Sequence, residues 1–262
     1  MNNYKFLFFV CLFVIFSVKA QINTYSPYSY YGYGVLHSST NTHNVAMGGM
    51  GLSIADNQYL NYLNPASYSF LDKTSFEFGF RTSYIKMSQG NLSQKNFTSG
   101  LSNIGLGFPL SSNIGISVAL LPYSSVGYDL TTQSNLTTSN NNIQTSYNYK
   151  GSGGLNKLLF GFAYSITDGI MNNFSFGTNL NYLFGSIERE VIVFSDNSNL
   201  YFRDKQDNIS NGLSIEISGL YTKLINTKKS KNYKLNGAFK FSPSSKIKSN
   251  RNILQATFAG PI

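Results

Sequence analysis

Histidine, cysteine and serine are the residues of this chain with the greatest potential for chemistry. The 262 residues include two histidines, His37 and His43, and one cysteine, Cys11. A single cysteine cannot form an internal disulfide or a cysteine-rich zinc site. A hydrolase needs a serine activated by a histidine, and two histidines six residues apart in one N-terminal stretch are better explained by packing or surface positions. We therefore expect no enzyme, no catalytic residue, no metal and no cofactor.

A glycine-rich stretch, Met47-Gly48-Gly49-Met50-Gly51, is the second feature that suggests chemistry. Phosphate-binding loops carry Gly-x-Gly-x-x-Gly or a Walker lysine, and this stretch has neither pattern. Glycine also allows backbones to approach closely. We interpret Gly48, Gly49 and Gly51 as packing positions in a compact plug.

The first twenty residues have the features of a secretory signal peptide. Lys5 precedes an apolar run over residues 6–18, and Val18-Lys19-Ala20 supplies small residues at a cleavage site before Gln21. The run is shorter than the roughly 20 residues of a transmembrane helix, which disfavours the alternative of a short N-terminal anchor. No cysteine follows the cleavage site, which argues against a lipoprotein. We predict that residues 1–20 are removed on export.

Charge is sparse and locally basic. Only 12% of the residues are charged, compared with roughly 25% in typical globular domains. Every charged residue after Glu216 is a lysine or arginine. An exported chain rarely meets nucleic acid, so we expect no nucleic-acid partner. Solvated basic turns, or attraction to anionic lipid head groups and lipopolysaccharide, explain this excess better.

Beyond residue 75 the chain alternates with period two, which is typical of β-strands. Large apolar residues occupy one face, whereas glycine, serine and asparagine occupy the other. Seven convincing strands lie around residues 76–84, 104–110, 114–120, 158–166, 174–184, 213–221 and 233–241, with a weaker eighth around residues 252–258.

These strands favour a transmembrane β-barrel over a soluble sandwich. Five of the seven span 9 to 11 residues, which matches what a tilted strand needs to cross a bilayer. The export signal and the nearly uncharged apolar face agree with this interpretation. A tight turn at residues 111–113 is typical of the periplasmic side. The polar stretches at residues 128–155 and 187–209 are expected to be long outer loops. The predicted location is the bacterial outer membrane.

Residues 21–74 lack this alternation and carry a motif of their own. The glycine-rich stretch is followed by Ala55-Asp56-Asn57 and then by Asn64-Pro65-Ala66, all ahead of the first strand. This succession resembles the FadL/TodX-type outer-membrane transporters. Two further stretches, Ser26-Pro27-Tyr28-Ser29 and residues 121–128, resemble the Bacteroidetes-type branch of that family. Physically, Pro65 fixes its own φ and restricts Asn64, which favours a rigid corner.

The resemblance implies a function and a domain organisation. Residues 21–74 would be an N-terminal hatch or plug, and residues 75–262 the barrel wall. The implied function is passive transport of hydrophobic small molecules, such as long-chain fatty acids or aromatic hydrocarbons, by a monomer. Tyr30, Tyr31 and Tyr33 are candidates to line the ligand pocket. Pro122 lacks a donor for the strand ladder and marks a candidate break in the wall.

An alternative function and an incomplete barrel are also expected. FadL-like barrels also serve as structural or accessory components, for example of a protein-secretion machine, and fold does not fix function. A packed interior would favour that role over transport. The family's fourteen strands do not fit into residues 75–262, so the resemblance implies a C-terminally incomplete chain. We therefore predict an open half-barrel of seven or eight strands whose first and last strands are not paired.

Overall fold

The computed structural model describes residues 24–138, 141–166, 173–195, 200–227 and 231–259. The predicted signal peptide lies outside these residues. Three short helices, η1 (Pro27–Tyr30), α2 (Thr42–Ala46) and η2 (Pro65–Phe70), belong to the stretch before the sheet. The strands are β1 (Val35–Leu36), β2 (Ser75–Gln89), β3 (Leu92–Ser111), β4 (Ile114–Thr138), β5 (Asn141–Ile166), β6 (Phe174–Ser195), β7 (Leu200–Thr227), β8 (Lys231–Phe241) and β9 (Ile247–Ala259). None of the described helices has the length and apolar character required to cross a bilayer.

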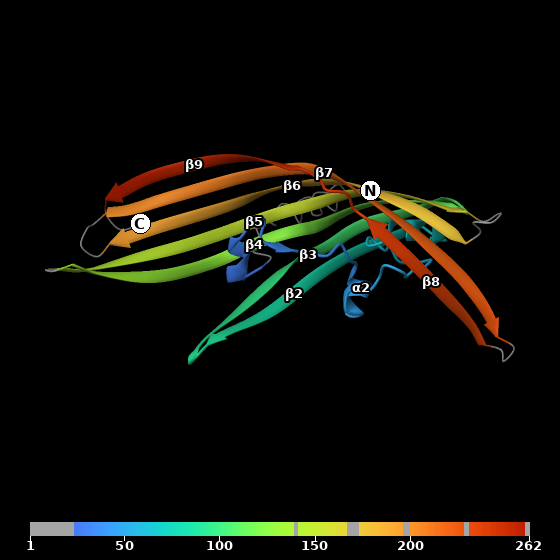
Figure 1. The fold of residues 1–262 in the computed structure, drawn as a ribbon, viewed down its shortest axis with the longest axis horizontal. Coiled ribbons are helices and arrows are strands. Elements are labelled where there is room, and N and C mark those ends of the chain that lie inside the picture. The colour runs from blue at the N-terminus through green and yellow to red at the C-terminus, as the bar shows by residue number, and fades with distance from the viewer. Residues whose placement is uncertain (1–23, 139–140, 167–172, 196–199, 228–230, 260–262) are drawn as a thin grey trace, which may run out of the picture.

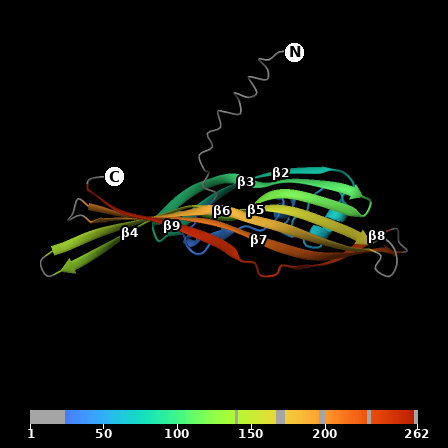
Figure 2. The ribbon, with the colours of Figure 1, turned by 90° about the horizontal axis from the view of Figure 1, so that it is seen from above.

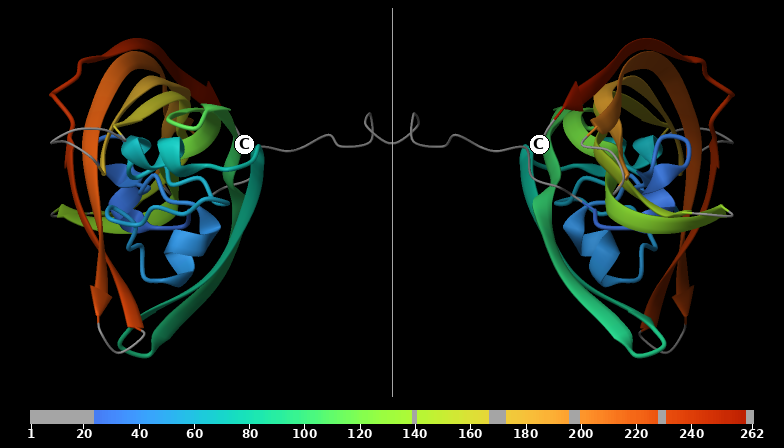
Figure 3. Two further views of the ribbon diagram at one scale, coloured as in Figure 1. Left: turned by 90° about the vertical axis from the view of Figure 1, so that its right-hand side faces the viewer. Right: turned by 90° about the vertical axis from the view of Figure 1, so that its left-hand side faces the viewer.

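One antiparallel sheet curls into a half-barrel. Its strands follow the order β2-β3-β4-β5-β6-β7-β8, so each strand pairs with its neighbour in sequence. The first strand, β2, does not pair with β8 or β9, and the sheet stays open (Figure 1). Seen along its long axis, the wall arches around residues 24–74, which we call the N-terminal segment (Figure 3). The prediction of an all-β, antiparallel, open half-barrel is confirmed.

The predicted seventh and eighth strands share one position in the wall. β8 pairs with residues 217–227 of β7, and β9 pairs with residues 200–212 of the same strand. Residues 242–246 interrupt the pairing, and they include Pro243, which has no N–H to donate. The wall therefore has seven strand positions, and the last is an interrupted strand.

The prediction of long polar loops at residues 128–155 and 187–209 is wrong. The structure continues both stretches as hairpins, in which β4 pairs with β5 and β6 pairs with β7 almost to the turns. Polar side chains interact across these strands: Asn148 donates to Asp129 at 3.0 Å and to Thr131 at 3.1 Å, and Lys205 lies 2.8 Å from Glu188. Cross-strand pairs of this kind stabilise a sheet. The change to polar residues therefore marks where the strands leave the apolar band, and the strands do not end there.

The two faces of the wall differ as the alternation predicts. The core lies on the concave face, where Leu60, Tyr62, Tyr68 and Leu71 of the N-terminal segment pack against Ala119, Leu121, Leu159 and Ala163 of the wall. Along the long axis, the hairpins project beyond the N-terminal segment at both ends (Figure 2). The convex face carries an exposed apolar band, formed by Phe76, Phe78, Phe80, Leu106, Leu110, Phe160, Phe162, Leu180, Tyr182, Leu213, Ile215, Ile217, Leu235, Phe239 and Phe241.

Candidate functional site

Buried asparagines hold the N-terminal segment in shape. This segment has little regular secondary structure, so its backbone groups need other partners. The Asn61 side chain donates to the carbonyl of Ile54 at 2.9 Å. The Asn41 side chain accepts the N–H of Asn44 at 2.8 Å and thereby caps α2. Side-chain amides therefore replace the missing strand ladder in a compact fold.

The Asn64-Pro65-Ala66 motif begins η2. The Asn64 side chain accepts the N–H of Ala66 at 3.0 Å and donates to the carbonyl of Leu52 at 2.6 Å. Pro65 occupies the first turn of η2, where the absence of an N–H costs nothing. The same Ala66 N–H contacts the hydroxyl of Ser218 on β7 at 2.9 Å. The motif thus both starts a helix and joins that helix to the wall.

The three glycines predicted as packing positions differ from one another. Gly48 and Gly49 have φ angles of +76° and +81°, in the left-handed region that favours glycine. A Cβ on either would meet no heavy atom within 4 Å. Only Gly51 is crowded, because a Cβ there would lie 2.4 Å from the Asn44 side chain. The first two glycines therefore serve turn geometry, and the third serves close packing.

Glycines of the wall allow η2 to approach closely. A Cβ on Gly115 would lie 1.9 Å from the carbonyl oxygen of Tyr68, and one on Gly177 would lie 2.3 Å from the backbone nitrogen of Ala66. A Cβ on Gly161 would lie 2.3 Å from a carbon atom of the Tyr68 ring. The small face of the alternating strands is therefore the surface on which the N-terminal segment packs.

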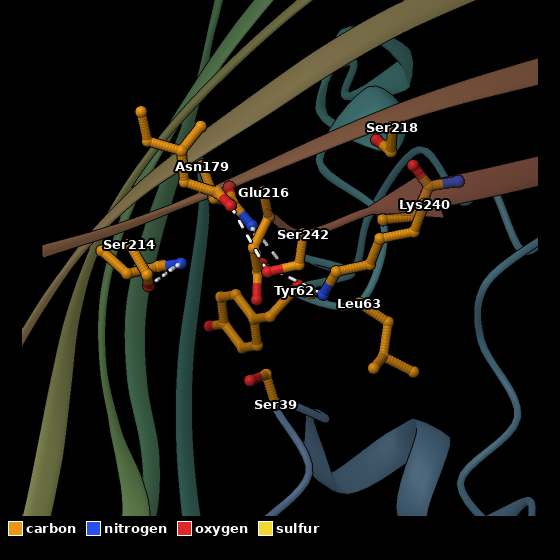
Figure 4. A network of polar contacts seen from close by, with 12 residues as sticks. Ser39, Tyr62, Leu63, Asn179, Ser214, Glu216, Ser218, Lys240 and Ser242 are labelled. Atoms are coloured by element: carbon orange, nitrogen blue, oxygen red, sulfur yellow. Dashed lines mark hydrogen bonds and ion pairs between the residues drawn. The ribbon is translucent and has the colours of Figure 1, made fainter. Parts of the chain in front are cut away.

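A charged network crosses the concave face beside η2 (Figure 4). Glu216 of β7 lies 3.1 Å from the Lys240 ammonium group and 3.8 Å from that of Lys157. Asn179 donates to Glu216 at 3.1 Å and accepts the Tyr68 hydroxyl at 3.2 Å. This network was not expected from the sequence. Its signal was the presence of Lys157, Glu216 and Lys240 on the small face of otherwise apolar strands.

The network ties the wall to the N-terminal segment. The Lys157 ammonium group also contacts the hydroxyl of Ser39, and Lys157 is only 3% exposed. A buried charge requires a partner of opposite charge and hydrogen bonds, and Glu216 provides the carboxylate. Two lysines share one carboxylate, so the three groups carry a formal excess of one positive charge. The contacts of the network with Ser39 and, through Asn179, with Tyr68 indicate a structural role.

A split opens in the wall between β3 and β4 (Figure 1). The ladder between these strands covers β4 only as far as Leu120. From there the hairpin of β2 and β3 diverges, while β4 stays paired with β5 to Thr138. The register of β4 shifts between Pro122 and Ser124. Pro122 therefore lies at the start of this split, next to an irregularity in the ladder.

The N-terminal segment fills the narrow end of the split. β1 pairs with β4 at Ser124 and Ser125. The N–H of His37 donates to the carbonyl of Tyr123 at 2.9 Å, and the N–H of Ser26 donates to that of Gly127 at 2.9 Å. The chain thus adds a short strand of its own to the edge that β3 leaves.

His37 occupies this filled part of the split. Its Nε2 lies 2.7 Å from the hydroxyl of Ser125. Burial, and secondly the positive charge of Arg81, lower the pKa of His37 from its usual value. His43 instead stacks on the ring of Tyr59, with 4.9 Å between ring centroids.

The three predicted ligand-lining tyrosines lie together at a depression bordered by β6, β7 and β9. The Tyr30 ring packs edge-on against Tyr128 at 5.5 Å between centroids, and Tyr33 packs against the buried cluster that contains Tyr128. Tyr31 is largely exposed. All three border an open depression that also includes Arg189 and Arg251. The structure therefore brings them together at a surface of mixed polarity.

The chain was compared with protein families, with curated proteins and with solved structures. The BamG family model matches residues 3–260, nearly the whole chain. No curated protein and no solved structure matches it. Among the described residues, no group of histidine, cysteine and acidic side chains could hold a metal ion.

The BamG match corrects four of our predictions. The chain is not a FadL/TodX-type transporter. The prediction that it transports hydrophobic compounds is therefore also wrong. The prediction of a small-molecule substrate and a monomer gives way to a protein partner. The incompleteness that we inferred from fourteen strands loses its basis. The chain belongs to the BamG family, whose members are components of the BAM complex, the biogenesis machinery associated with the bacterial outer membrane.

Proposed function

We propose that this chain is a non-enzymatic accessory component of the BAM complex, and that it braces the complex at the outer membrane. The observation that carries the proposal is the family match across residues 3–260. The match covers the N-terminal segment and the wall alike, so the proposal assigns one role to both. In this proposal residues 1–20 are a signal peptide, residues 21–74 an internal brace and residues 75–262 the wall.

The packed interior supports an accessory role. A transporter of this shape needs an apolar path along the concave face. Here Leu60, Tyr62 and Tyr68 fill that face and are at most 1% exposed. The cavity next to His37 holds only about 30 Å³, which is far below the roughly 300 Å³ of a small ligand pocket. The larger clefts, of about 650 and 530 Å³, are not lined by Leu60, Tyr62 or Tyr68 and lie outside this packed region. Such an interior suits a rigid structural element.

The convex face supports a location within the membrane plane. Contiguous exposed apolar surfaces of this kind mark contact with lipid or protein. We assign the apolar band to the lipid of the outer membrane. Backbone groups of the open edges must find partners in such a setting. The outer edge of β2 and that of β8 and β9 are therefore the sites where we expect other BAM-complex components to bind.

A strain that lacks the chain tests this function. We expect lower amounts of folded β-barrel proteins in its outer membranes, measured by quantitative proteomics and by heat-modifiable migration on gels. Expression of the wild-type chain should restore these amounts. Uptake of radiolabelled oleate by the same strain serves as the comparison. We expect the uptake to fall by no more than the amounts of the folded barrel proteins fall. Normal barrel-protein levels in the deletion strain would contradict the proposal.

A further inference from the structure

The backbone of β4 points its hydrogen-bonding groups into the split at every second residue. In an antiparallel strand, the N–H and C=O of one residue point to the same side, and those of the next residue point to the other. On β4 the carbonyl groups of Tyr123 and Gly127 accept N–H groups of the N-terminal segment. The N–H of Gly127 donates to the hydroxyl of Ser29 at 3.1 Å. The odd-numbered residues therefore face the split here.

The same alternation continues beyond the N-terminal segment. The pairing of β4 with β5 runs without a register shift from Ser124 to Thr138, and no residue of β4 has a positive φ angle. The backbone groups of Asp129, Thr131 and Gln133 therefore also point into the split. β3 does not pair with this part of β4. Within the described chain, these three residues have no backbone partner on that side.

The surroundings of this free edge differ between its two faces. On the inner face, a cleft of about 650 Å³ opens beside it. Its lining consists of Tyr25, Pro27, Tyr28, Met87, Tyr128 and Leu130 together with the polar residues Ser88, Ser93, Gln94 and Asp129. On the other face, the side chains of Thr131 and Gln133 are exposed and polar, whereas the exposed Asp129 also borders the cleft. A strand that pairs with this edge would place alternate residues in an aromatic cleft and in a polar environment. Such a strand alternates apolar and polar side chains.

We propose that β4, from Asp129 to Gln133, binds an extended strand of an outer-membrane β-barrel protein by strand addition. The proposal rests on the proposed function, which requires a protein partner, and it specifies which segment of that partner binds. Strand addition takes its affinity from main-chain hydrogen bonds and its specificity from pockets for alternate side chains. The N-terminal segment already binds the neighbouring part of the edge in this way, so the added strand would extend an existing row of hydrogen bonds.

A fluorescent peptide with the sequence of residues 174–184, Phe-Ser-Phe-Gly-Thr-Asn-Leu-Asn-Tyr-Leu-Phe, is a suitable probe because it alternates in the required way. Its binding to the purified full chain in detergent is measured by fluorescence anisotropy. Thr131→Pro removes one N–H that faces the split, and the pairing of residue 131 with β5 does not use that group. Thr131→Ala is the matched control, because it removes the side chain and keeps the N–H. Thermal unfolding checks that both variants fold.

We expect Thr131→Pro to weaken peptide binding on the order of tenfold, and Thr131→Ala to bind as the wild type does. Gln133→Pro should behave like Thr131→Pro. Equal binding by Thr131→Pro and Thr131→Ala would overturn the proposal, as would an absence of binding to the wild type. Dimerisation of the chain that only the proline variants abolish would assign the edge to a second copy and also overturn it. Association with the BAM complex, measured in parallel, reports separately on the proposed function.

Discussion

At the scale of single residues, Glu216 has the most demanding environment. Its carboxylate lies between the ammonium groups of Lys157 and Lys240, on the face where η2 packs. Ion pairs of this kind add little net stability when complete, because desolvation offsets the attraction. Removal of one partner is different, since the remaining charges stay buried without compensation.

Glu216→Gln is therefore expected to lower the free energy of unfolding by about 3–5 kcal/mol. Chemical denaturation of the purified chain in detergent measures this change. Glu188→Gln is the matched control, because Glu188 pairs with Lys205 where the Glu188 side chain is 45% exposed, and exposed pairs contribute about 0–1 kcal/mol. Equal losses in the two variants would show that the interior network is not a buried charge cluster.

At this scale, turns were more predictable from the sequence than contacts between distant residues were. Asn64, Pro65 and Ala66 form a corner, as their chemistry predicts, because the properties of Asn-Pro are local. His37 and Glu216 have contacts that depend on residues 88 and 37 positions away in the chain, respectively. The composition of the chain and the spacing of its residues do not predict contacts between residues that are so far apart in the sequence.

At the scale of elements, the fit between η2 and the wall depends on glycine. Gly177→Ala is expected to destabilise the protein by about 1–3 kcal/mol, because its Cβ would meet backbone atoms of Pro65 and Ala66 that cannot move aside easily. Gly237→Ala on β8 is the matched control, since a Cβ there would meet nothing within 4 Å. Thermal unfolding and thermolysin cleavage within the N-terminal segment measure both effects.

Two outcomes would contradict the close packing of η2 on the wall. If Gly177→Ala and Gly237→Ala leave stability and cleavage unchanged, close approach of η2 to the wall is not required. If Gly237→Ala alone destabilises the protein, the interrupted last strand is more sensitive than the interior. We expect neither result, because only Gly177 faces the N-terminal segment.

The central parts of the strands could be predicted from sequence, whereas their ends could not. Alternation is strong where one face meets apolar surroundings, as in residues 158–166. It fades where both faces are polar, as beyond Tyr128, although the hydrogen-bonded ladder continues there. The shared position of β8 and β9 was also missed. Two short patterns on either side of Pro243 do not reveal that both pair with β7.

At the scale of the whole molecule, the half-barrel was predictable and the family was not. The open sheet was predicted because the fourteen strands of the resembled FadL/TodX-type family do not fit into residues 75–262. A correct shape therefore followed from a family to which the chain does not belong. The family assignment relied on a glycine-rich stretch and the Asn64-Pro65-Ala66 motif. The structure gives both features local explanations, namely left-handed turns and the start of η2. A compact segment packed on a curved sheet needs such features in any family, so they did not distinguish transport from assembly.

The composition of the native complex that contains this chain tests the central claim most directly. The full chain, carrying a C-terminal affinity tag at its native expression level, is isolated from outer membranes in mild detergent. Native gel electrophoresis and mass spectrometry then measure its size and its components. Our account predicts one large species that contains the subunits of the BAM complex together with this chain. A tagged chain that migrates as a monomer, without BAM-complex subunits, would contradict it.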